Sequence, residues 1–435
     1  MLLVTMIFSA IPARGLRARV GVLTLAPNVQ PVAAVDWWPM FRHDPSHTGY
    51  STSTAPNTNN TIWNYTTGDW VVSSPAVADG KVYVGSWDNK TYCLNASTGA
   101  HIWNYTIGRS QYSSPAVADG MVFVGSQDNK VYALNASTGE LVWNYTLQDS
   151  VTCEPTVVGG KVYIGSHGDG GGSGHVYALD ATTGTLLWNY STGGNHVYSS
   201  PAVADGKVYT GWWNQIVALN ASTGALVWKC IMLAGSFTAP AVNGDIVYIG
   251  GWGPGVEANK LHALNASTGA PLWNYTMGSP RSPAVAYGKV YVGSSDNKTY
   301  CLDASNGAHV WNYTTGSYVS SSPAVADGKV YVGSYDYKVY CLNASTGAHI
   351  WNYTTGYWVW SSPAVADGKV FVGSWDKKVY AFGPPPSPPA VGGVIVPVDK
   401  FALLAPYIAL ASTILVATAA TAIYVKHAKH RKKKQ

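Results

Sequence analysis

The chain has few cysteines for its length. Five cysteines among 435 residues give no disulfide framework, and the absence of a Cys-x-x-Cys-His motif excludes covalent haem attachment. Cys93, Cys301 and Cys341 occupy equivalent positions in a repeating unit, so we expect small buried residues too far apart to bridge. Cys153 and Cys230 stay open as a pair that could form one disulfide.

Helical periodicity and a basic main domain are also missing. No segment before residue 401 has a convincing helical period. Six of the 27 Lys and Arg residues lie in residues 426–435, which leaves 21 against 22 Asp and Glu elsewhere. A nucleic-acid partner therefore has no electrostatic support. No Ser/His/Asp arrangement or phosphate-binding loop stands out, and we assign no catalytic residue.

What the sequence does contain is a repeat of about 40 residues. Most copies end in the phrase Trp-Asn-Tyr-Thr, and the tryptophan recurs at spacings of 38 to 45 residues. A period in this range is typical of a solenoid, a propeller or an array. The eight tryptophans are Trp63, Trp103, Trp143, Trp188, Trp228, Trp273, Trp311 and Trp351.

Each unit contains four short runs, here named A to D, rich in Val, Tyr and Trp and separated by Asp-Gly, Asp-Asn and Thr-Gly. Such runs predict antiparallel strands joined by hairpins, and four strands per unit form a propeller blade. The last unit stops after run C, whereas the first repeat is a lone run D at residues 61–67. We predict an all-β, eight-bladed β-propeller over residues 57–383 in which this N-terminal strand completes the last blade and closes the ring.

The repeated residues themselves predict scaffold roles. A large aromatic residue once per blade is expected to pack between neighbouring blades. The glycine of each Thr-Gly or Asn-Gly turn between runs C and D is expected to need a positive φ. These glycines are Gly99, Gly139, Gly184, Gly224, Gly269, Gly307 and Gly347.

The phrase Ala-x-Asn/Asp-x-x-Thr-Gly-x-x-x-Trp, at residues 133–143 and 178–188, resembles the tryptophan-docking motif of the pyrroloquinoline-quinone (PQQ)-like β-propeller repeat family. Residues 36–50 resemble the lead-in common in that family, so His43 and His47 are expected to be structural. The resemblance implies a fold rather than an activity. The family includes quinone-dependent alcohol dehydrogenases and non-enzymatic scaffolds such as the outer-membrane assembly lipoprotein of the β-barrel machinery.

The two ends of the chain predict an anchored surface protein. Residues 1–34 fit a cleaved signal sequence, with an uncleaved anchor or a misassigned start as alternatives, and residues 35–56 form the lead-in. After a stiff Pro-rich stalk at 384–400, residues 401–425 are apolar, uncharged and long enough to cross a bilayer. The basic tail at 426–435 places the C-terminus in the cytoplasm and the propeller outside the plasma membrane. A buried soluble helix is the alternative for residues 401–425.

Sequons of the form Asn-x-Ser/Thr are dense, which suggests glycosylation of an external domain and an archaeal surface protein. The alternative is that the asparagine of each Asn-Ala-Ser-Thr-Gly phrase only orders its turn, as Asp does in the family motif. The candidate glycosylation sites are Asn64, Asn95, Asn104, Asn135, Asn144, Asn189, Asn220, Asn265, Asn274, Asn312, Asn343 and Asn352.

Strand polarity separates a uniform face from a variable one. The A–B and C–D loops share one face and repeat the same residues, whereas the B–C and D–A loops share the other face, vary, and are rich in aromatic residues. Loops on a rigid scaffold commonly carry binding, and aromatic surface favours protein or carbohydrate partners. The alternative is that some of these rings fill the centre of the propeller. The predicted ligand-binding face comprises Trp70, Trp87, Tyr112, Trp212, Trp213, Trp252, Tyr318, Tyr335, Tyr357, Trp358, Trp360 and Trp375.

Two functions compete at this stage. The first is a non-catalytic, membrane-anchored scaffold that binds a partner through the variable face and needs no metal or cofactor. The alternative is a PQQ-dependent dehydrogenase, which would need Ca²⁺ in a cluster of oxygen ligands and an Asp base. The resemblance implies adjacent cysteines for such an enzyme, and none occur here. The acids that vary between units are few: Asp69, Asp149, Glu154, Asp169 and Glu257. The Gly-rich segment 167–175 could hold a metal, but a flexible loop is the simpler interpretation.

Overall fold

The computed structural model describes residues 35–108, 112–167 and 174–384. The predicted signal sequence, the transmembrane helix at 401–425, the basic tail and all but the first residue of the stalk lie outside the described residues. The regular structure of the described residues consists of strands, and none of their segments is a helix that could cross a bilayer.

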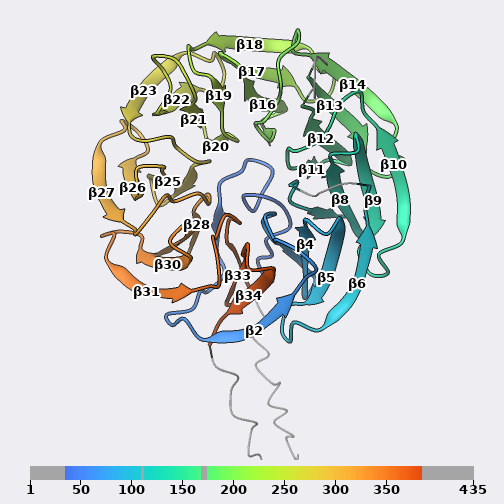
Figure 1. Ribbon diagram of the computed structural model, residues 1–435. Coiled ribbons are helices and arrows are strands. Elements are labelled where there is room, and N and C mark those ends of the chain that lie inside the picture. The colour runs from blue at the N-terminus through green and yellow to red at the C-terminus, as the bar shows by residue number, and fades with distance from the viewer. Residues whose placement is uncertain (1–34, 109–111, 168–173, 385–435) are drawn as a thin grey trace, which may run out of the picture.

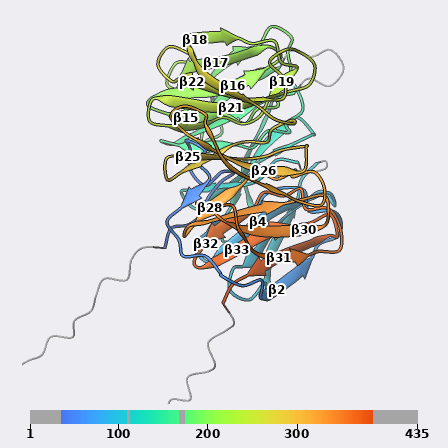
Figure 2. The same ribbon diagram turned by 90° about the vertical axis from the view of Figure 1, so that its left-hand side faces the viewer.

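Eight sheets arranged in a ring form the predicted propeller, and Figure 1 views the ring along its axis. Blades 1 to 8 are named in chain order, and within each blade strands A to D run from the centre outwards. Figure 2 shows the molecule turned by 90°. The innermost A strands are β3 (Ala76–Ala78), β7 (Ala116–Ala118), β11 (Thr156–Val158), β15 (Ala202–Ala204), β20 (Ala241–Asn243), β24 (Ala284–Ala286), β28 (Ala324–Ala326) and β32 (Ala364–Ala366).

The other strands follow the repeated runs. The B strands are β4 (Lys81–Ser86), β8 (Met121–Ser126), β12 (Lys161–Gly165), β16 (Lys207–Trp212), β21 (Ile246–Trp252), β25 (Lys289–Gly293), β29 (Lys329–Gly333) and β33 (Lys369–Gly373). The C strands are β5 (Lys90–Asn95), β9 (Lys130–Asn135), β13 (His175–Asp180), β17 (Gln215–Asn220), β22 (Lys260–Asn265), β26 (Lys298–Asp303), β30 (Lys338–Asn343) and β34 (Lys378–Phe382). The outermost D strands are β6 (His101–Thr106), β10 (Leu141–Thr146), β14 (Leu186–Ser191), β18 (Leu226–Ile231), β23 (Pro271–Thr276), β27 (His309–Thr314), β31 (His349–Thr354) and β2 (Thr61–Thr66).

The ring closes as predicted. Strand β2 pairs antiparallel with β34, with Thr61 opposite Phe382 and Thr66 opposite Lys378. The two strands lie side by side at the bottom of Figure 1, where blue meets red. Blade 8 is therefore built from both ends of the repeat region, so no sheet edge is left open at the junction.

Two sheets contain one strand more than the predicted four. Strand β1 (Tyr50–Ser51) pairs parallel with β28, and β19 (Ser236–Phe237) pairs with β21. The prediction of four antiparallel strands was thus incomplete, because the first strand comes from the lead-in and the second from an extended D–A connection.

Each repeated tryptophan packs against the next blade, as predicted. The indole Nε1 of Trp103 in blade 1 donates a hydrogen bond to the carbonyl oxygen of Ala136 in blade 2, at 3.2 Å. The same bond recurs around the ring, and at blade 7 Trp351 donates to Pro56 of the lead-in at 3.3 Å instead. The apolar clusters likewise combine residues of adjacent blades, so the core is a set of inter-blade layers.

The lead-in crosses the centre of the ring, where it appears as the blue coil in Figure 1. Its carbonyl oxygens accept hydrogen bonds from the central valine N–H of the A strands in six blades. Trp38 accepts from Val77 at 2.6 Å, for example, and Gly49 accepts from Val325 at 2.8 Å. The inner strands would otherwise present these N–H groups to the central channel, so the lead-in supplies them with partners.

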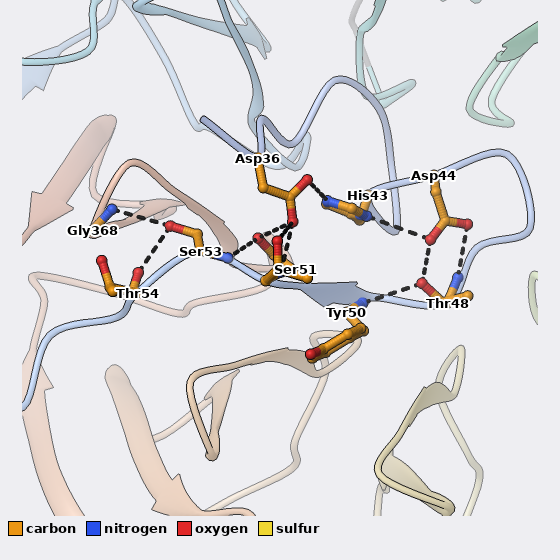
Figure 3. A network of polar contacts seen from close by, with 10 residues as sticks. Asp36, His43, Asp44, Thr48, Tyr50, Ser51, Ser53, Thr54 and Gly368 are labelled. Carbon is orange, nitrogen blue, oxygen red and sulfur yellow. Dashed lines mark hydrogen bonds and ion pairs between the residues drawn. The ribbon is translucent and has the colours of Figure 1, made fainter. Parts of the chain in front are cut away.

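Buried polar side chains hold the lead-in in place, and they confirm the structural role expected for His43 and His47. His43 lies between Asp36 and Asp44, with its Nε2 at 3.1 Å from Asp36 and its Nδ1 at 3.4 Å from Asp44 (Figure 3). His47 is fully buried and its Nε2 lies 2.9 Å from Thr156 Oγ1. Arg42, 2% exposed, donates to the carbonyl oxygens of Pro283 and Pro323 in two neighbouring blades.

Candidate functional site

A cavity of about 510 Å³ opens at the centre of the variable face. Its walls come from the D–A connections of the eight blades, with Gln127 and His167 added by B–C loops and Trp252 by the end of strand β21. Phe41 from the lead-in lines its inner end. Strand polarity places the variable loops on one face, as predicted, and the structure adds that they surround a cavity.

The residue that precedes the proline before each A strand lines the cavity in every blade except blade 2, and these eight equivalent positions are here named the neck. This residue is serine in six blades, Glu154 in blade 3 and Ala239 in blade 5. Neighbouring blades are linked here because the backbone N–H of one such residue donates to the side chain of the next. Ser74 donates to Ser114 at 2.9 Å, and Ser362 donates to Ser74 at 3.0 Å across the ring closure.

Glu154 places a carboxyl group in this ring of hydroxyls. Ser200 donates to Oε2 of Glu154, and Ser114 lies 3.5 Å from Oε1. Burial raises the pKa of Glu154, although the serine hydrogen bonds oppose the shift. Within the described residues it is the one carboxylate that lines the cavity.

The guanidinium of Arg281 places a positive charge in the wall of the cavity. It precedes blade 6 at the position that is serine in most blades, and Ser282 follows it at the neck. Burial lowers the pKa of Arg281, while the nearby Tyr335 acts in the opposite direction. Its Nε is buried and has no hydrogen-bond partner among the described residues.

Nine of the twelve predicted aromatic residues form a continuous arc over blades 7, 8, 1 and 2, here named the aromatic rim. Trp70 stacks on Trp375 with ring centroids 4.4 Å apart and planes at 13°. Trp360 in turn stacks on Trp375 at 5.4 Å, and Tyr335 stacks on Trp358 at 4.8 Å. The rim comprises Trp70, Trp87, Tyr112, Tyr318, Tyr335, Tyr357, Trp358, Trp360 and Trp375.

The other three predicted aromatic residues lie elsewhere. Trp252 faces Tyr198 at 6.2 Å across blades 4 and 5, on a part of the cavity wall outside the rim. Trp213 is half exposed and joins no ring contact in the described part of the chain. Trp212 is 1% exposed, so it does not belong to the binding surface. It ends strand β16 at a position that points into the core and that is serine in blades 1 and 2, and its ring packs near Tyr190.

Glu154 was predicted as one of the acids that vary between units, but its meeting with Arg281 and Tyr198 in one cavity was not predicted. The signal was available as a departure from a repeated phrase. Most blades read Ser-Ser-Pro before the A strand, whereas blade 3 reads Cys-Glu-Pro and blade 6 reads Arg-Ser-Pro. Where an inward-facing residue differs from its equivalents in the other blades, the cavity wall has a different chemical character at that blade.

The cysteines and acids do not form further clusters. All five cysteines are free thiols, and the Sγ of Cys153 donates to the Val197 carbonyl at 2.9 Å, so the Cys153–Cys230 pair is not formed. Within residues 35–108, 112–167 and 174–384, no group of three His, Cys, Asp or Glu side chains is arranged to hold a metal ion. Glu257 forms an ion pair with Lys260 at 3.1 Å.

The predicted glycosylation sites fall into two structural groups. The asparagines of the C–D turns accept hydrogen bonds through Oδ1 from the backbone N–H groups two and three residues later, as Asn135 does at 2.8 and 3.0 Å. Those of the outer D strands lie on the perimeter of the ring, where Asn144 and Asn189 are exposed. The structure thus supports the turn-ordering role for the first group.

Comparison with known proteins agrees with this geometry. A family model described as outer membrane protein assembly factor BamB matches residues 48–211, 172–322 and 314–383. No curated protein matches the sequence.

Solved structures with the same fold include both kinds of relative. BamB from Moraxella catarrhalis is 19% identical with a TM-score of 0.63, over 74% of this chain and 99% of that one. A europium-containing methanol dehydrogenase is 16% identical with a TM-score of 0.67, over 80% of this chain and 98% of that one. The quinohemoprotein alcohol dehydrogenase from Comamonas testosteroni is 17% identical with a TM-score of 0.68, over 81% of this chain and 82% of that one. At these identities the likeness concerns the fold alone.

Proposed function

The chain belongs to the family of the outer membrane protein assembly factor BamB, a family of PQQ-like repeat β-propellers, and from this premise we propose that it is a non-catalytic binding scaffold. In this proposal residues 401–425 anchor it in the plasma membrane, the propeller lies outside the cell, and a partner protein docks on the aromatic rim.

The aromatic rim is the observation that carries the proposal. Aromatic side chains supply large contact areas at low entropic cost and are enriched where protein partners bind most tightly. Tyr318 and Tyr357 remain 50% and 37% exposed at the edge of the rim, although their neighbours stack on one another. A stacked set is also pre-organised, so little side-chain freedom is lost when a partner covers it.

The alternative of a PQQ-dependent dehydrogenase has weaker support in the side chains of the cavity. Calcium takes six to eight oxygen ligands, commonly from several carboxylates. Glu154 is the single carboxylate among the described lining residues, and burial raises its pKa, which acts against the ionised form that a metal ion binds. This donor set does not fit a Ca²⁺–quinone site, so we derive no redox step.

Site-specific crosslinking tests the scaffold proposal. A photoreactive residue at Tyr357 in the full-length protein, expressed in its own membrane, should crosslink to a discrete protein. Trp358→Ala with Trp360→Ala should reduce the yield severalfold, whereas Trp213→Ala, which removes an exposed indole outside the rim, should not. Equal yields from all variants, or products that contain only carbohydrate, would refute a protein partner at the rim.

A titration tests the alternative. The purified protein should show no saturable binding of PQQ in the presence of Ca²⁺ and no alcohol-driven dye reduction. Positive results in both assays would replace the scaffold proposal with the dehydrogenase.

A further inference from the structure

One part of the cavity wall consists of hydrogen-bond donors that lack acceptors. Arg281 lies in this wall with its Nε buried and without a partner. No ion pair in the described ranges joins its guanidinium to a carboxylate; burial lowers the pKa of Arg281, and the phenol of Tyr335 acts against that shift. A buried N–H of a guanidinium without an acceptor is costly, because the desolvation of that donor is not compensated.

A second unsatisfied donor lies on the neighbouring blade. Ser320 lines the same cavity from the connection that enters blade 7, and its Oγ is buried with no hydrogen-bond partner in the described structure. Ser282 and Ser322 line the cavity from the same two connections. The wall between blades 6 and 7 therefore offers a guanidinium and hydroxyl groups and contains no acidic side chain among its described residues.

The cavity as a whole is matched to a single negative charge. Arg281 is the one Lys or Arg residue among the described residues that line it. Glu154 lies three blades away, where Ser200 and Ser114 already hold its carboxyl group. The remaining wall combines aromatic rings, Trp360, Tyr112 and Tyr198 among them, with hydroxyl and aliphatic side chains. A polyanion would meet too few cations, whereas one carboxylate next to an apolar group meets both kinds of surface.

We propose that Arg281 and Ser320 form a subsite for a carboxylate group of a peptide segment from the partner protein. The inference rests on the proposed scaffold function, since it specifies what the partner inserts into the cavity while the rest of it contacts the aromatic rim. A volume of about 510 Å³ accommodates one or two residues rather than a folded element. Arginine is suited to this task because its planar fork can donate two parallel bonds to a carboxylate. The carboxylate comes either from a C-terminus or from an Asp or Glu side chain.

Three small probes separate these sources in a binding experiment on the full-length protein. N-acetylphenylalanine carries a terminal carboxylate, N-acetylphenylalanine amide carries none, and N-acetylglutamic acid α-amide carries only a side-chain carboxylate. Quenching of tryptophan fluorescence, or calorimetry, measures each dissociation constant. We expect at least one acid to bind about tenfold more tightly than the neutral amide, which corresponds to a charge-assisted hydrogen bond. The preferred acid identifies the source.

Variants test whether the subsite is responsible. Arg281→Met should weaken binding of the preferred acid at least about tenfold and leave binding of the amide unchanged, and Ser320→Ala should weaken it severalfold. Lys207→Met, which removes a cation from the opposite face, should have no effect. Arg281→Met should also keep or raise the thermal unfolding midpoint of the free protein, because an uncompensated buried charge is removed.

Two results would overturn the inference. One is equal affinity for acids and amide. The other is unchanged acid binding by Arg281→Met together with a lower unfolding midpoint, which would make Arg281 a structural residue. Failure of the scaffold proposal looks different, because crosslinking at Tyr357 would be lost or insensitive to the rim variants while the small acids still distinguished wild type from Arg281→Met.

Discussion

Gly139 of blade 2 lies against the indole ring of Trp103 of blade 1, so closely that a Cβ atom on the glycine would be 2.6 Å from Cδ2 of the tryptophan. Gly139 also has a φ of 76°. The same contact and the same φ recur at seven of the eight blade junctions. Two constraints therefore require glycine at each of these turns. One is the positive φ of the backbone, and the other is the close contact with the indole ring, which leaves no room for a Cβ atom.

Alanine substitution should separate these two requirements. Gly120→Ala, at a φ of 73° with no atom within 4 Å of the new Cβ, should cost about 1–2 kcal/mol for the left-handed backbone alone. Gly139→Ala adds a clash with Trp103, and we expect an extra cost of about 1–3 kcal/mol. Thermal unfolding midpoints should therefore rank wild type above Gly120→Ala and Gly120→Ala above Gly139→Ala. Equal midpoints for the two variants would contradict the packing role of the glycine.

Arg42 should be essential for fixing the lead-in. Arg42→Met leaves the carbonyl oxygens of Pro283 and Pro323 without this donor, at a cost of about 1–3 kcal/mol for each unsatisfied group, partly offset because a buried charge is removed. We expect a lower unfolding midpoint and faster proteolysis of residues 35–56. Thr54→Ala, an exposed position of the same segment, serves as the control. A lead-in that resists protease equally in both variants would argue against this role.

The lead-in also predicts a pH dependence of stability. Burial opposes the charge on His43, but the hydrogen bonds that its ring N–H groups donate to Asp36 and Asp44 dominate and raise its pKa to about 9. Because the pKa of His43 is higher in the folded state, this histidine contributes its full stabilisation below pH 6.5. The contribution is lost as the pH rises through 9. His43→Gln should thus reduce the loss of unfolding free energy between pH 6.5 and 9, a loss that is at most on the order of 3–4 kcal/mol.

The contribution of His47 to stability has the opposite pH dependence, because it is lost at low pH. Burial lowers the pKa of His47 to about 3, so its contribution is lost as pH falls below 6.5. The difference in unfolding free energy between wild type and His43→Gln, measured across pH 6 to 9.5, isolates His43. Parallel pH profiles of the two proteins would show that His43 does not carry this charge.

Glycosylation should favour the perimeter of the ring over its turns. The side chains of Asn144 and Asn189 are exposed on outer strands, whereas Asn135 already uses its Oδ1 to order a turn. Mass spectrometry of protein from the native membrane should find glycans at the outer-strand sequons at higher occupancy. Asn135→Asp should be well tolerated, because Asp180 occupies the equivalent position in blade 3 and accepts the same backbone bonds. Higher occupancy at Asn135 than at Asn144 would contradict this order.

Much of the fold was predictable because it depends on local and repeated signals. The Asp-Gly turns read directly as hairpins, since Asp79 and Gly80 both adopt the positive φ that such turns require. The missing last run and the lone first run predicted the pairing of β2 with β34. The aromatic residues of the variable face were identified one by one, but their stacking order was not, because Trp70 and Trp375 lie about 300 residues apart in sequence and meet only through ring closure.

By itself the sequence determined the number of blades, their strand order and the division into a uniform and a variable face, because the same local strand and turn signals recur in each of the eight units. Only the tertiary structure decided which of the variable residues meet. It buried Trp212 between blades, put the lead-in across the channel, and brought Glu154, Arg281 and Trp360 into one cavity. The physical reason is that a ring converts equivalent positions of distant repeats into neighbours around a common axis. The chemistry of the central cavity is therefore set by the few residues that break the repeat.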